Sequence, residues 1–280
     1  MKKLSIIILS YNVRKLLVDC LNSLPKYPDW EIIVPDNGSS DDSVAVVKKD
    51  FPRVMLVENH KNIGFAAGNN VGIHAAQGEY VLLLNPDTIV YPNSIETVLK
   101  YVQDHPEVGA ATCRVELPDG SLDYSCHRGF PTPWGAGLHF LGLRQYSTYT
   151  AQNISNGIHQ IDALTGAFAL VRRTAGEQVG WLDEDYFWNG EDIDFCYKLK
   201  EAGWKVMYVP TVKITHFKGS SAKATSESRQ KWALNSTEVM ALFYRKHLAQ
   251  KYPFFINWIV YLGIWVTRKL RTISAPTVRA

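Results

Sequence analysis

Cysteine is scarce in this chain of 280 residues, which has four cysteines and no Cys-x-x-Cys pair. Closely spaced pairs mark structural zinc sites, and regular frameworks of cysteines mark disulfide-stapled secreted domains, so neither class is indicated. We expect reduced thiols, as in the cytoplasm, at the four positions Cys20, Cys113, Cys126 and Cys196.

Long apolar runs are also missing from the sequence. A bilayer-spanning helix needs about 20 apolar residues in a row, and no run reaches that length. The first apolar run, Leu4–Leu9, is too short for a secretory signal, and no small-residue cleavage site follows it. A signal peptide is therefore not expected, and this run is predicted to be a buried β-strand.

Acidic residues are absent after Glu238, where seven lysines and arginines occur instead. Subtracting these seven from the total of 30 leaves 23 basic residues against 27 acidic ones in the first 238 positions. The net charge of +3 thus combines a mildly acidic body with a basic tail. This distribution favours one local anionic partner and argues against a nucleic-acid-binding surface across the body.

The Gly-x-Gly-x-x-Gly fingerprint of dinucleotide-binding domains does not follow the first predicted strand. An NAD-dependent enzyme is therefore disfavoured, and a failure to bind NAD would exclude it. The first half of the chain nevertheless alternates short apolar runs with helical patterns, which predicts βαβ units and an α/β fold with a mainly parallel sheet flanked by helices. Strands are expected at residues 4–9, 31–34, 54–57, 80–84 and 109–113.

The pattern weakens between Leu117 and Gln160, where Gly, Pro, Ser and aromatic residues dominate. A segment of this length without periodicity is typical of a binding loop or lid. Regular structure is expected again as a helix at Glu191–Ala202, a strand at Lys205–Val209 and a long helix at Ser226–Ala249.

Polar clusters follow each of the first four predicted strands, at 10–12, 36–41, 62–70 and 85–88. The carboxyl ends of parallel strands share one edge of a sheet, so the clusters are expected to line a single crevice. Each cluster has a structural alternative. The Asp36–Asp41 segment also fits a turn followed by a helix cap, and glycines at 64, 68 and 72 also fit a close-packed helix face.

Taken together, seven motifs in order resemble glycosyltransferase family 2, across roughly residues 4–221. They are Ser5-Ile-Ile-Ile-Leu-Ser-Tyr-Asn12, Asp36-Asn-Gly-Ser-Ser-Asp41, Asn62-Ile-Gly-Phe-Ala-Ala-Gly-Asn-Asn70, Leu82-Leu-Leu-Asn-Pro-Asp-Thr88, Thr165-Gly-Ala167, Gly190-Glu-Asp-Ile-Asp194 and His216-Phe-Lys-Gly-Ser-Ser221. The resemblance implies an inverting enzyme with an A-type glycosyltransferase fold. The Asn-Pro-Asp variant is similar to bacterial rhamnosyltransferases of surface-polysaccharide synthesis.

The family's organisation implies a catalytic domain at residues 1–225, with a nucleotide-sugar-binding half at 1–115 and an acceptor-side half at 116–225. Residues 226–280 would form a C-terminal helical extension. Asp36 is expected to accept the imide N–H of uracil or thymine, so the donor would be a UDP- or dTDP-sugar. The donor-binding residues carried over from the motifs are Ser10, Tyr11, Asn12, Asp36, Asn37, Asn62, Gly68, Asn69 and Asn85.

The resemblance also implies a divalent metal, Mg²⁺ or Mn²⁺, bound by Asp87 and His216. Such an ion neutralises the charge that develops on a diphosphate leaving group. Asn85 stands where the family commonly has a first aspartate, which removes one charge from the site. A catalytically silent nucleotide-sugar-binding protein is therefore the alternative function, which a transfer or donor-hydrolysis assay would decide.

The acidic run at 191–194 fits acids at a helix N-terminus, and in the family it supplies the general base. Asp192 is the predicted base and Glu191 the alternative, and no second carboxylate suits a double-displacement, retaining mechanism. Phe187 and Trp188 are the predicted acceptor-binding residues, since aromatic faces stack on sugars, although both equally fit a core position.

The tail from Pro253 to Val266 is almost entirely apolar, and basic clusters flank both of its ends. It fits a core helix or a subunit contact, and it also fits an interfacial anchor whose basic flanks meet anionic lipid. We favour the anchor, because the acceptor of such enzymes is often lipid-linked. The expected location is cytoplasmic, on the inner face of the cell membrane, with a glycan or lipid-linked acceptor, and the oligomeric state is left open.

Overall fold

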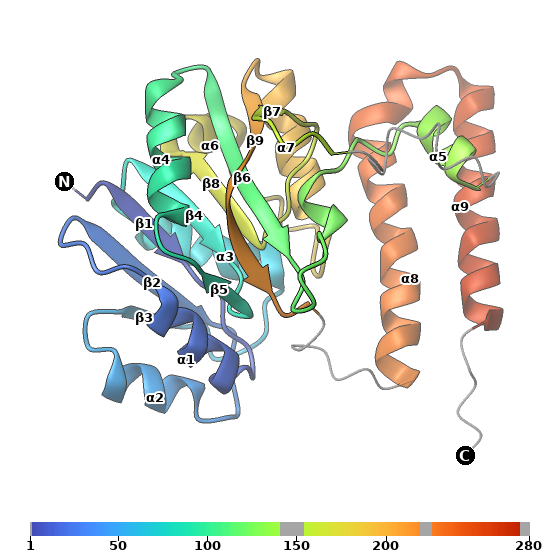
Figure 1. Cartoon of the computed structure of the whole chain (residues 1–280). Coiled ribbons are helices and arrows are strands. Elements are labelled where there is room, and N and C mark those ends of the chain that lie inside the picture. Colours follow the sequence, from blue (N-terminus) through green and yellow to red (C-terminus); the bar gives the residue numbers. More distant parts are fainter. Residues whose placement is uncertain (1, 141–153, 219–225, 275–280) are drawn as a thin grey trace.

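The computed structural model describes residues 2–140, 154–218 and 226–274. Figure 1 shows a body built around one sheet, with two long helices, α8 and α9, standing beside it. The helices are α1 (Arg14–Ser23), α2 (Ser43–Asp50), α3 (Phe65–Ala75), α4 (Ser94–Asp104), α5 (Pro133–Phe140), α6 (Arg173–Val179), α7 (Glu191–Glu201), α8 (Ser226–Phe243) and α9 (Phe254–Ser274), with short turns η1 (Tyr124–Cys126), η3 (Tyr244–Leu248) and η4 (Ala249–Lys251).

Nine strands of the described residues form a single sheet. They are β1 (Leu4–Ile7), β2 (Trp30–Asp36), β3 (Met55–Glu58), β4 (Tyr80–Leu84), β5 (Thr88–Val90), β6 (Val108–Glu116), β7 (His159–Gln160), β8 (Phe168–Arg172) and β9 (Lys205–His216). The order is β3-β2-β1-β4-β8-β6-β9-β5, and β7 pairs with β9. Strands β1 to β4 pair in parallel, as do β6 and β9.

The second half of the sheet is mixed, because β8 is inserted antiparallel between β4 and β6. Strands β5 and β7 also pair antiparallel with β9. The predicted α/β architecture is therefore confirmed as a mixed sheet flanked by helices, with its parallel part at the N-terminal strands. This order leaves the carboxyl ends of β1, β2 and β4 at one edge, as the motifs require.

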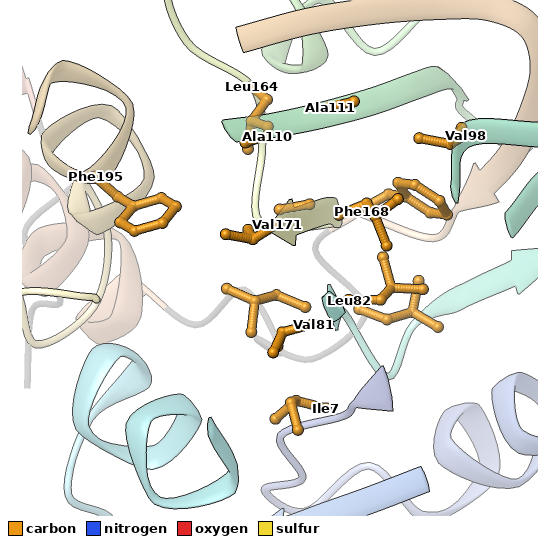
Figure 2. Packing of buried hydrophobic residues seen from close by; sticks show 14 of the residues in the cluster. Ile7, Val81, Leu82, Val98, Ala110, Ala111, Leu164, Phe168, Val171 and Phe195 are labelled. Carbon is orange, nitrogen blue, oxygen red and sulfur yellow. The ribbon is translucent and has the colours of Figure 1, made fainter. Parts of the chain in front are cut away.

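Strands β1 and β4 are buried at every position, and apolar apart from Ser5 and the Tyr80 hydroxyl, because helices cover both faces of the sheet. Figure 2 shows the core where β1, β4, β8 and β6 lie next to one another, with labelled side chains from Ile7, Val81, Leu82, Val171 and Ala110. All five side chains are fully buried. The four cysteines are buried and free, in agreement with the expectation of reduced thiols.

The helices expected at 191–202 and 226–249 are present, and the second ends differently from the prediction. Helix α8 ends at Phe243, and the chain then forms a wider π-turn, η3, followed by a 3₁₀ turn, η4. Helix α9 then folds back along α8. Among the residues that the structure describes, no helix has the length and apolar character needed to cross a membrane.

The η3 turn is attached to helix α7 by charged contacts. His247 Nε2 lies 2.5 Å from Oδ1 of Asp194, which is fully buried. Lys246 lies 2.5 Å from Asp183 and 2.6 Å from Asp185 in the loop before α7. The C-terminal helices thus support the helix that carries the acidic motif, while the domain division at residue 225 stays a prediction.

Candidate functional site

The loops that follow β1 and β2 are joined into one unit by the first two sequence motifs. Ser10 and Asp36 form an isolated parallel bridge beyond the ends of these strands. Asn12 has a positive φ of 54°, which directs its side chain towards the second loop, where Oδ1 accepts hydrogen bonds from the backbone N–H (2.7 Å) and hydroxyl of Ser40. Asn12 therefore fixes the relative position of the two loops.

Asp36 is the buried carboxylate of this unit. Its Oδ1 accepts the backbone N–H of Ser39 at 2.8 Å, and its Oδ2 accepts the Ser39 hydroxyl at 2.6 Å. A carboxylate has about four lone-pair sites, so both oxygens retain capacity to accept a further donor. The carboxylate is held in a fixed orientation, which is what recognition of a nucleobase N–H requires.

The third motif is bound to the same loops through a network of side-chain amides. Asn37 donates to the carbonyl of Gly64 at 3.0 Å and accepts from Asn59 at 2.9 Å. Asn62 accepts the backbone N–H of Gly64 at 3.0 Å. These contacts place the loops after β1, β2 and β3 side by side, as the single-crevice prediction required.

Other predicted donor-binding residues have structural contacts. A Cβ at Gly68 would lie 2.6 Å from Leu9 Cδ1, so glycine is needed for packing there. Asn69 is buried and donates to the Phe65 carbonyl within its own helix at 2.9 Å. Ser10 is buried as well, whereas the Tyr11 side chain is 42% exposed. The donor-binding role of these residues stays a prediction.

Strand pairing brings together the two predicted metal ligands, which are 129 positions apart in the numbering. Strand β5 pairs antiparallel with β9, with Thr88 opposite His216, and the backbone N–H of Phe217 donates to the Asp87 carbonyl at 2.8 Å. As a result, His216 Nε2 lies 3.3 Å from Asp87 Oδ1. Asn85 Nδ2 lies 3.4 Å from the same ring nitrogen.

The opposite ring nitrogen of His216 contacts a residue that the sequence analysis missed. Asp123, which is buried, places Oδ2 at 3.2 Å from His216 Nδ1. Its other oxygen accepts from the Lys218 ammonium at 2.9 Å and from both the backbone N–H and the hydroxyl of Ser125. Asp123 lies in the segment without periodicity, so no local pattern could have identified it.

Charge around His216 determines its protonation. Burial lowers the pKa of this imidazole, but hydrogen bonds to Asp123 and Asp87 outweigh burial and raise the pKa to about 9. Burial opposes ionisation of Asp123, yet its bonds to His216, Lys218 and Ser125 hold the pKa of that carboxyl below its usual range. The contacts with Asp123 and Asp87 therefore favour the protonated form of His216 in the absence of a bound cation.

The arrangement fits a hard divalent cation. Ligands at about 2.1 Å from an octahedral ion lie about 3.0 Å apart, close to the separation of the Asp87 oxygen and His216 Nε2. Asp123 on Nδ1 corresponds to the carboxylate that commonly orients a metal-ligating histidine. A group of three or more His, Cys, Asp or Glu side chains able to hold a metal is not found within 2–140, 154–218 and 226–274. The site thus offers two side-chain ligands and would leave other positions to phosphate and water.

The acidic motif opens helix α7, after Gly190 with its positive φ of 91°. Asp192 is paired with Arg128, whose guanidinium nitrogen lies 2.5 Å from Oδ2 and also donates to the Leu164 carbonyl. Arg128 is positioned by reciprocal backbone bonds with Ala163. It too lies in the segment without periodicity, and a lone arginine there carried no signal.

Glu191 lies deeper than Asp192. Burial, and then the negative charge of Asp192, raise the pKa of Glu191 to about 8. Glu191 is 5% exposed, so its carboxyl group is poorly placed to meet an acceptor directly. Adjacent carboxyls in different environments can serve different functions.

Phe187 and Trp188 lie before this helix, with side chains 40% and 57% exposed. Their rings meet edge to face at 4.9 Å. The backbone N–H of Phe65 donates to the Phe187 carbonyl at 2.7 Å, and a Cβ on Gly64 would lie 2.8 Å from the Phe187 ring. The aromatic pair is therefore exposed, and Phe187 is anchored next to the third motif. The acceptor-binding role of the pair stays a prediction.

The sequence profile of Glycosyl transferase family 2 matches residues 5–175, more than half of the chain. This match covers the loops after β1, β2 and β3, together with Asp87, Asp123 and Arg128.

The chain belongs to glycosyltransferase family 2.

Two relatives within the family are rhamnosyltransferases. N-acetylglucosaminyl-diphospho-decaprenol L-rhamnosyltransferase of Mycobacterium tuberculosis is 31% identical over 208 residues, which cover 68% of this chain and 67% of that protein. Rhamnosyltransferase WbbL of Escherichia coli is 30% identical over 183 residues, which cover 62% of this chain and 68% of that protein. The rhamnosyltransferase-like character predicted from Asn-Pro-Asp is thereby confirmed as a similarity.

The fold is shared with a solved mannosyltransferase structure. The mannosyltransferase PcManGT of Pyrobaculum calidifontis, in complex with GDP-Man and Mn²⁺, superposes with a TM-score of 0.62 at 18% identity. The match covers 99% of this chain and 76% of that one. This likeness confirms the A-type glycosyltransferase fold for this family 2 chain. Residues 219–221 of the last motif and 141–153 of the non-periodic segment lie outside the described residues.

Proposed function

We propose that this family 2 glycosyltransferase inverts the anomeric centre of a nucleotide-diphosphate sugar, with rhamnose as the favoured sugar, while transferring it to an acceptor hydroxyl. The observation that carries the proposal is the contact between Asp87 and His216. A fold that brings two potential ligands, far apart in the sequence, within 3.3 Å of each other supports an active transferase.

The donor is a UDP- or dTDP-sugar in this proposal. Asp36 accepts the imide N–H of the base, since Ser39 fixes its carboxylate and its oxygens have lone pairs remaining. The loops held by Asn12 and Asn37 flank the base and ribose. GDP-Man in the mannosyltransferase structure shows that the same fold also takes a guanine nucleotide, so the base is the part of the proposal that needs a direct test.

Asp87 and His216 would hold the divalent cation, Mg²⁺ or Mn²⁺, with the Asn85 amide beside them. When bound, the cation supplies charge neutralisation for the diphosphate leaving group. Asp123 keeps the His216 ring oriented, with Nδ1 facing the carboxylate and Nε2 facing Asp87. His216 must release its proton from Nε2 before that nitrogen can act as a ligand.

Asp192 is the proposed general base. It takes the proton of the acceptor hydroxyl as that oxygen bonds to the anomeric carbon, while the bond from carbon to the diphosphate oxygen breaks on the opposite face. Arg128 positions the Asp192 carboxylate. Phe187 and Trp188 offer exposed aromatic faces to the acceptor sugar.

We place the reaction in bacterial cell-surface polysaccharide synthesis, with a glycan or a lipid-linked sugar as acceptor. The Mycobacterium tuberculosis relative, whose name specifies a diphospho-decaprenol acceptor, supports the lipid-linked form. The enzyme would act at the inner face of the cell membrane. A silent nucleotide-sugar-binding protein remains the alternative, motivated by Asn85 in place of an acidic residue.

A thermal-shift screen followed by a transfer assay tests the proposal. Nucleotide sugars are screened with Mn²⁺, Mg²⁺ or excess chelator, because a ligand that binds the native state raises its stability according to affinity and concentration. A metal-dependent shift with a UDP- or dTDP-sugar, and transfer or hydrolysis of that donor above background, is expected. Binding without any turnover would favour the silent alternative, and full activity in chelator would refute the metal assignment.

A further inference from the structure

Helix α9 has two apolar faces, and only one of them is covered. Ile256, Val260 and Ile264 turn towards the protein and pack with α8. The opposite half of the helix exposes large side chains along its length, which we call the outward face. It consists of Phe254, Phe255, Trp258, Ile259, Tyr261, Leu262, Trp265, Val266 and Leu270.

The exposure of the outward face is large for a soluble surface. Phe254 is 83% exposed, Trp258 72% and Leu270 62%. A contiguous exposed apolar patch of this kind marks a site of interaction, whereas exposed apolar residues that are scattered singly are normal on protein surfaces. Figure 1 shows α9 at the edge of the molecule, on the side of α8 away from the sheet. Among the residues that the structure describes, the outward face is therefore exposed and available to a partner.

The charge around the outward face identifies the partner. Lys269 lies at its C-terminal end, whereas Arg268 is paired with Glu238 of α8 at 3.3 Å and Arg271 donates to Ser236 of the same helix. No acidic residue follows Glu238 in the sequence. Lys269 lies 5.7 Å from the centroid of the Trp265 ring, so a cation is placed directly beside an exposed aromatic residue. Tryptophan and tyrosine favour the headgroup boundary of a bilayer, and basic side chains favour anionic headgroups.

We propose that the outward face of α9 lies in the surface of an anionic lipid bilayer, parallel to the membrane plane. This deepens the membrane location given under Proposed function and rests on it. An interfacial helix buries its apolar face about 5–10 Å into the boundary between headgroups and acyl chains. The tight attachment of the inward face to α8 fixes how the body stands on the membrane.

A second copy of the chain is a poorer occupant of the outward face. A parallel two-fold contact between two α9 helices would bring Lys269 of one chain close to Lys269 of the other. Glu238 of α8 is already paired with Arg268 of its own chain, and no acidic residue follows it to neutralise Lys269. Anionic lipid supplies the missing opposite charge.

The outward face also continues towards the proposed acceptor site. A groove of about 440 Å³ is lined by Tyr261 of α9, by Arg245 of η3 and by Phe187 beside the acidic motif. Tyr261 is both a groove residue and part of the outward face. A sugar attached to a lipid in the same membrane surface would therefore approach the catalytic helix along this groove.

Flotation of the full chain with phosphatidylcholine vesicles, with and without phosphatidylglycerol, tests the proposal. The full chain should float with vesicles that contain phosphatidylglycerol. Trp258→Glu should lower the vesicle-bound fraction about tenfold or more, because it places a charge within the buried face. Lys269→Glu should weaken binding to vesicles that contain phosphatidylglycerol and leave binding to pure phosphatidylcholine vesicles unchanged. Met55→Glu, an exposed apolar position on edge strand β3, is the matched control and should bind as the wild type does.

Light scattering and nucleotide-sugar binding separate the outcomes. If the full chain does not float, or if Trp258→Glu floats as well as the wild type, the proposal is wrong. A dimer that Trp258→Glu dissociates, without vesicle binding, would likewise overturn it and assign the face to a subunit contact. Thermal shifts with nucleotide sugars should be the same in all variants. If the wild type shows no thermal shift with nucleotide sugars, that result would count against the transferase proposal and not against the membrane contact.

Discussion

At the residue scale, the acidic motif presents two adjacent carboxyls of different character. Asp192 is paired with Arg128 near the surface, whereas Glu191 is buried and its pKa is raised to about 8 by burial and by the charge of Asp192. The choice of Asp192 as base came from the resemblance and not from periodicity or spacing. The environments agree with it, because a base must be reachable by the acceptor hydroxyl.

Asp192→Asn should abolish transfer and leave donor binding nearly unchanged. Asparagine keeps the size of the side chain and can still accept from Arg128, but it cannot take a proton, and a general base contributes about 10²–10⁴-fold. Turnover and nucleotide-sugar binding are measured for Asp192→Asn and for Glu191→Gln. If Asp192→Asn keeps more than about a tenth of the activity, or if only Glu191→Gln is inactive, the assignment is wrong.

Asp123 provides a second test at the residue scale. Asp123→Asn should lower metal affinity about 10–100-fold, because the amide orients the His216 ring less strongly than the carboxylate does. Binding of Mn²⁺, followed by electron paramagnetic resonance with and without nucleotide diphosphate, gives a readout that does not depend on activity.

The chain offers a matched control for this substitution. Asp119 accepts from the backbone N–H and hydroxyl of Ser121, in the same way that Asp123 binds Ser125, but it is exposed and no contact to His216 is found for it in the described part of the chain. Asp119→Asn should leave Mn²⁺ affinity unchanged. Equal losses in the two variants would show that only the turn matters, and that Asp123 does not position the histidine.

At the scale of elements, the sequence predicted strands well where burial is continuous. Strands β1 and β4 are buried at every position and almost entirely apolar, so short apolar runs identified them. Strand β5 has three residues, too few to show a period, and it was missed. Strand β9 runs to His216, beyond the predicted end at Val209, because Pro210 interrupts the pattern although the strand continues through it.

The site follows the same distinction between local and long-range information. The polar clusters at strand ends could be located because each follows a recognisable strand. Asp123 and Arg128 reach the site only through pairing with distant segments, namely Val115 and Ala163, and no local pattern records such contacts. Residues that follow their own strand were therefore predictable from local patterns, whereas His216, which pairing of β9 with β5 brings to the site, was predicted only through the family resemblance.

Helix α7 links its buried N-terminus to the stability of the fold. The folded pKa of Glu191 is raised from 4.5 to about 8, so its burial is favourable while it is protonated and costs free energy once it ionises. Asp192, Asp194 and the cation Arg128 are the charged groups that act on it. Its contribution to stability is therefore complete below about 4.5 and is lost as the pH rises through about 8.

Glu191→Gln should remove that part of the pH dependence. Urea unfolding is measured at about pH 5 and about pH 9 for wild type and variant, since the slope of stability with pH reports the difference in bound protons. The variant should gain stability relative to wild type at the higher pH and little at the lower one. Glu201→Gln, at the exposed end of the same helix, is the control, and an identical response in both variants would refute the interpretation.

At the scale of the whole molecule, the resemblance placed the boundary of the catalytic domain at residue 225, yet contacts cross that boundary. His247 is bonded to buried Asp194, and Lys246 is bonded to two aspartates before α7. Val239 lies so close to Gly190 that a Cβ there would approach it at 2.3 Å. These contacts concern the helix that carries Asp192, so α8 and η3 support the proposed general base from behind.

Two truncations separate this support from the membrane role of α9. A chain that ends after Tyr252 keeps η3 and its ion pairs with the loop and helix α7, so it should fold and bind nucleotide diphosphate while losing attachment to anionic vesicles.

A chain that ends after residue 225 lacks His247, the partner of buried Asp194. Leaving a buried charge without one of its partners costs about 3–5 kcal/mol. We expect that shorter chain to be poorly folded and to give no nucleotide-dependent thermal shift.

The point variant His247→Ala in the full chain should show the same destabilisation on a smaller scale, with vesicle binding intact. If the chain that ends after residue 225 instead binds nucleotide diphosphate as tightly as the full chain, then the boundary at 225 is a true domain boundary and the contacts of η3 with α7 contribute little.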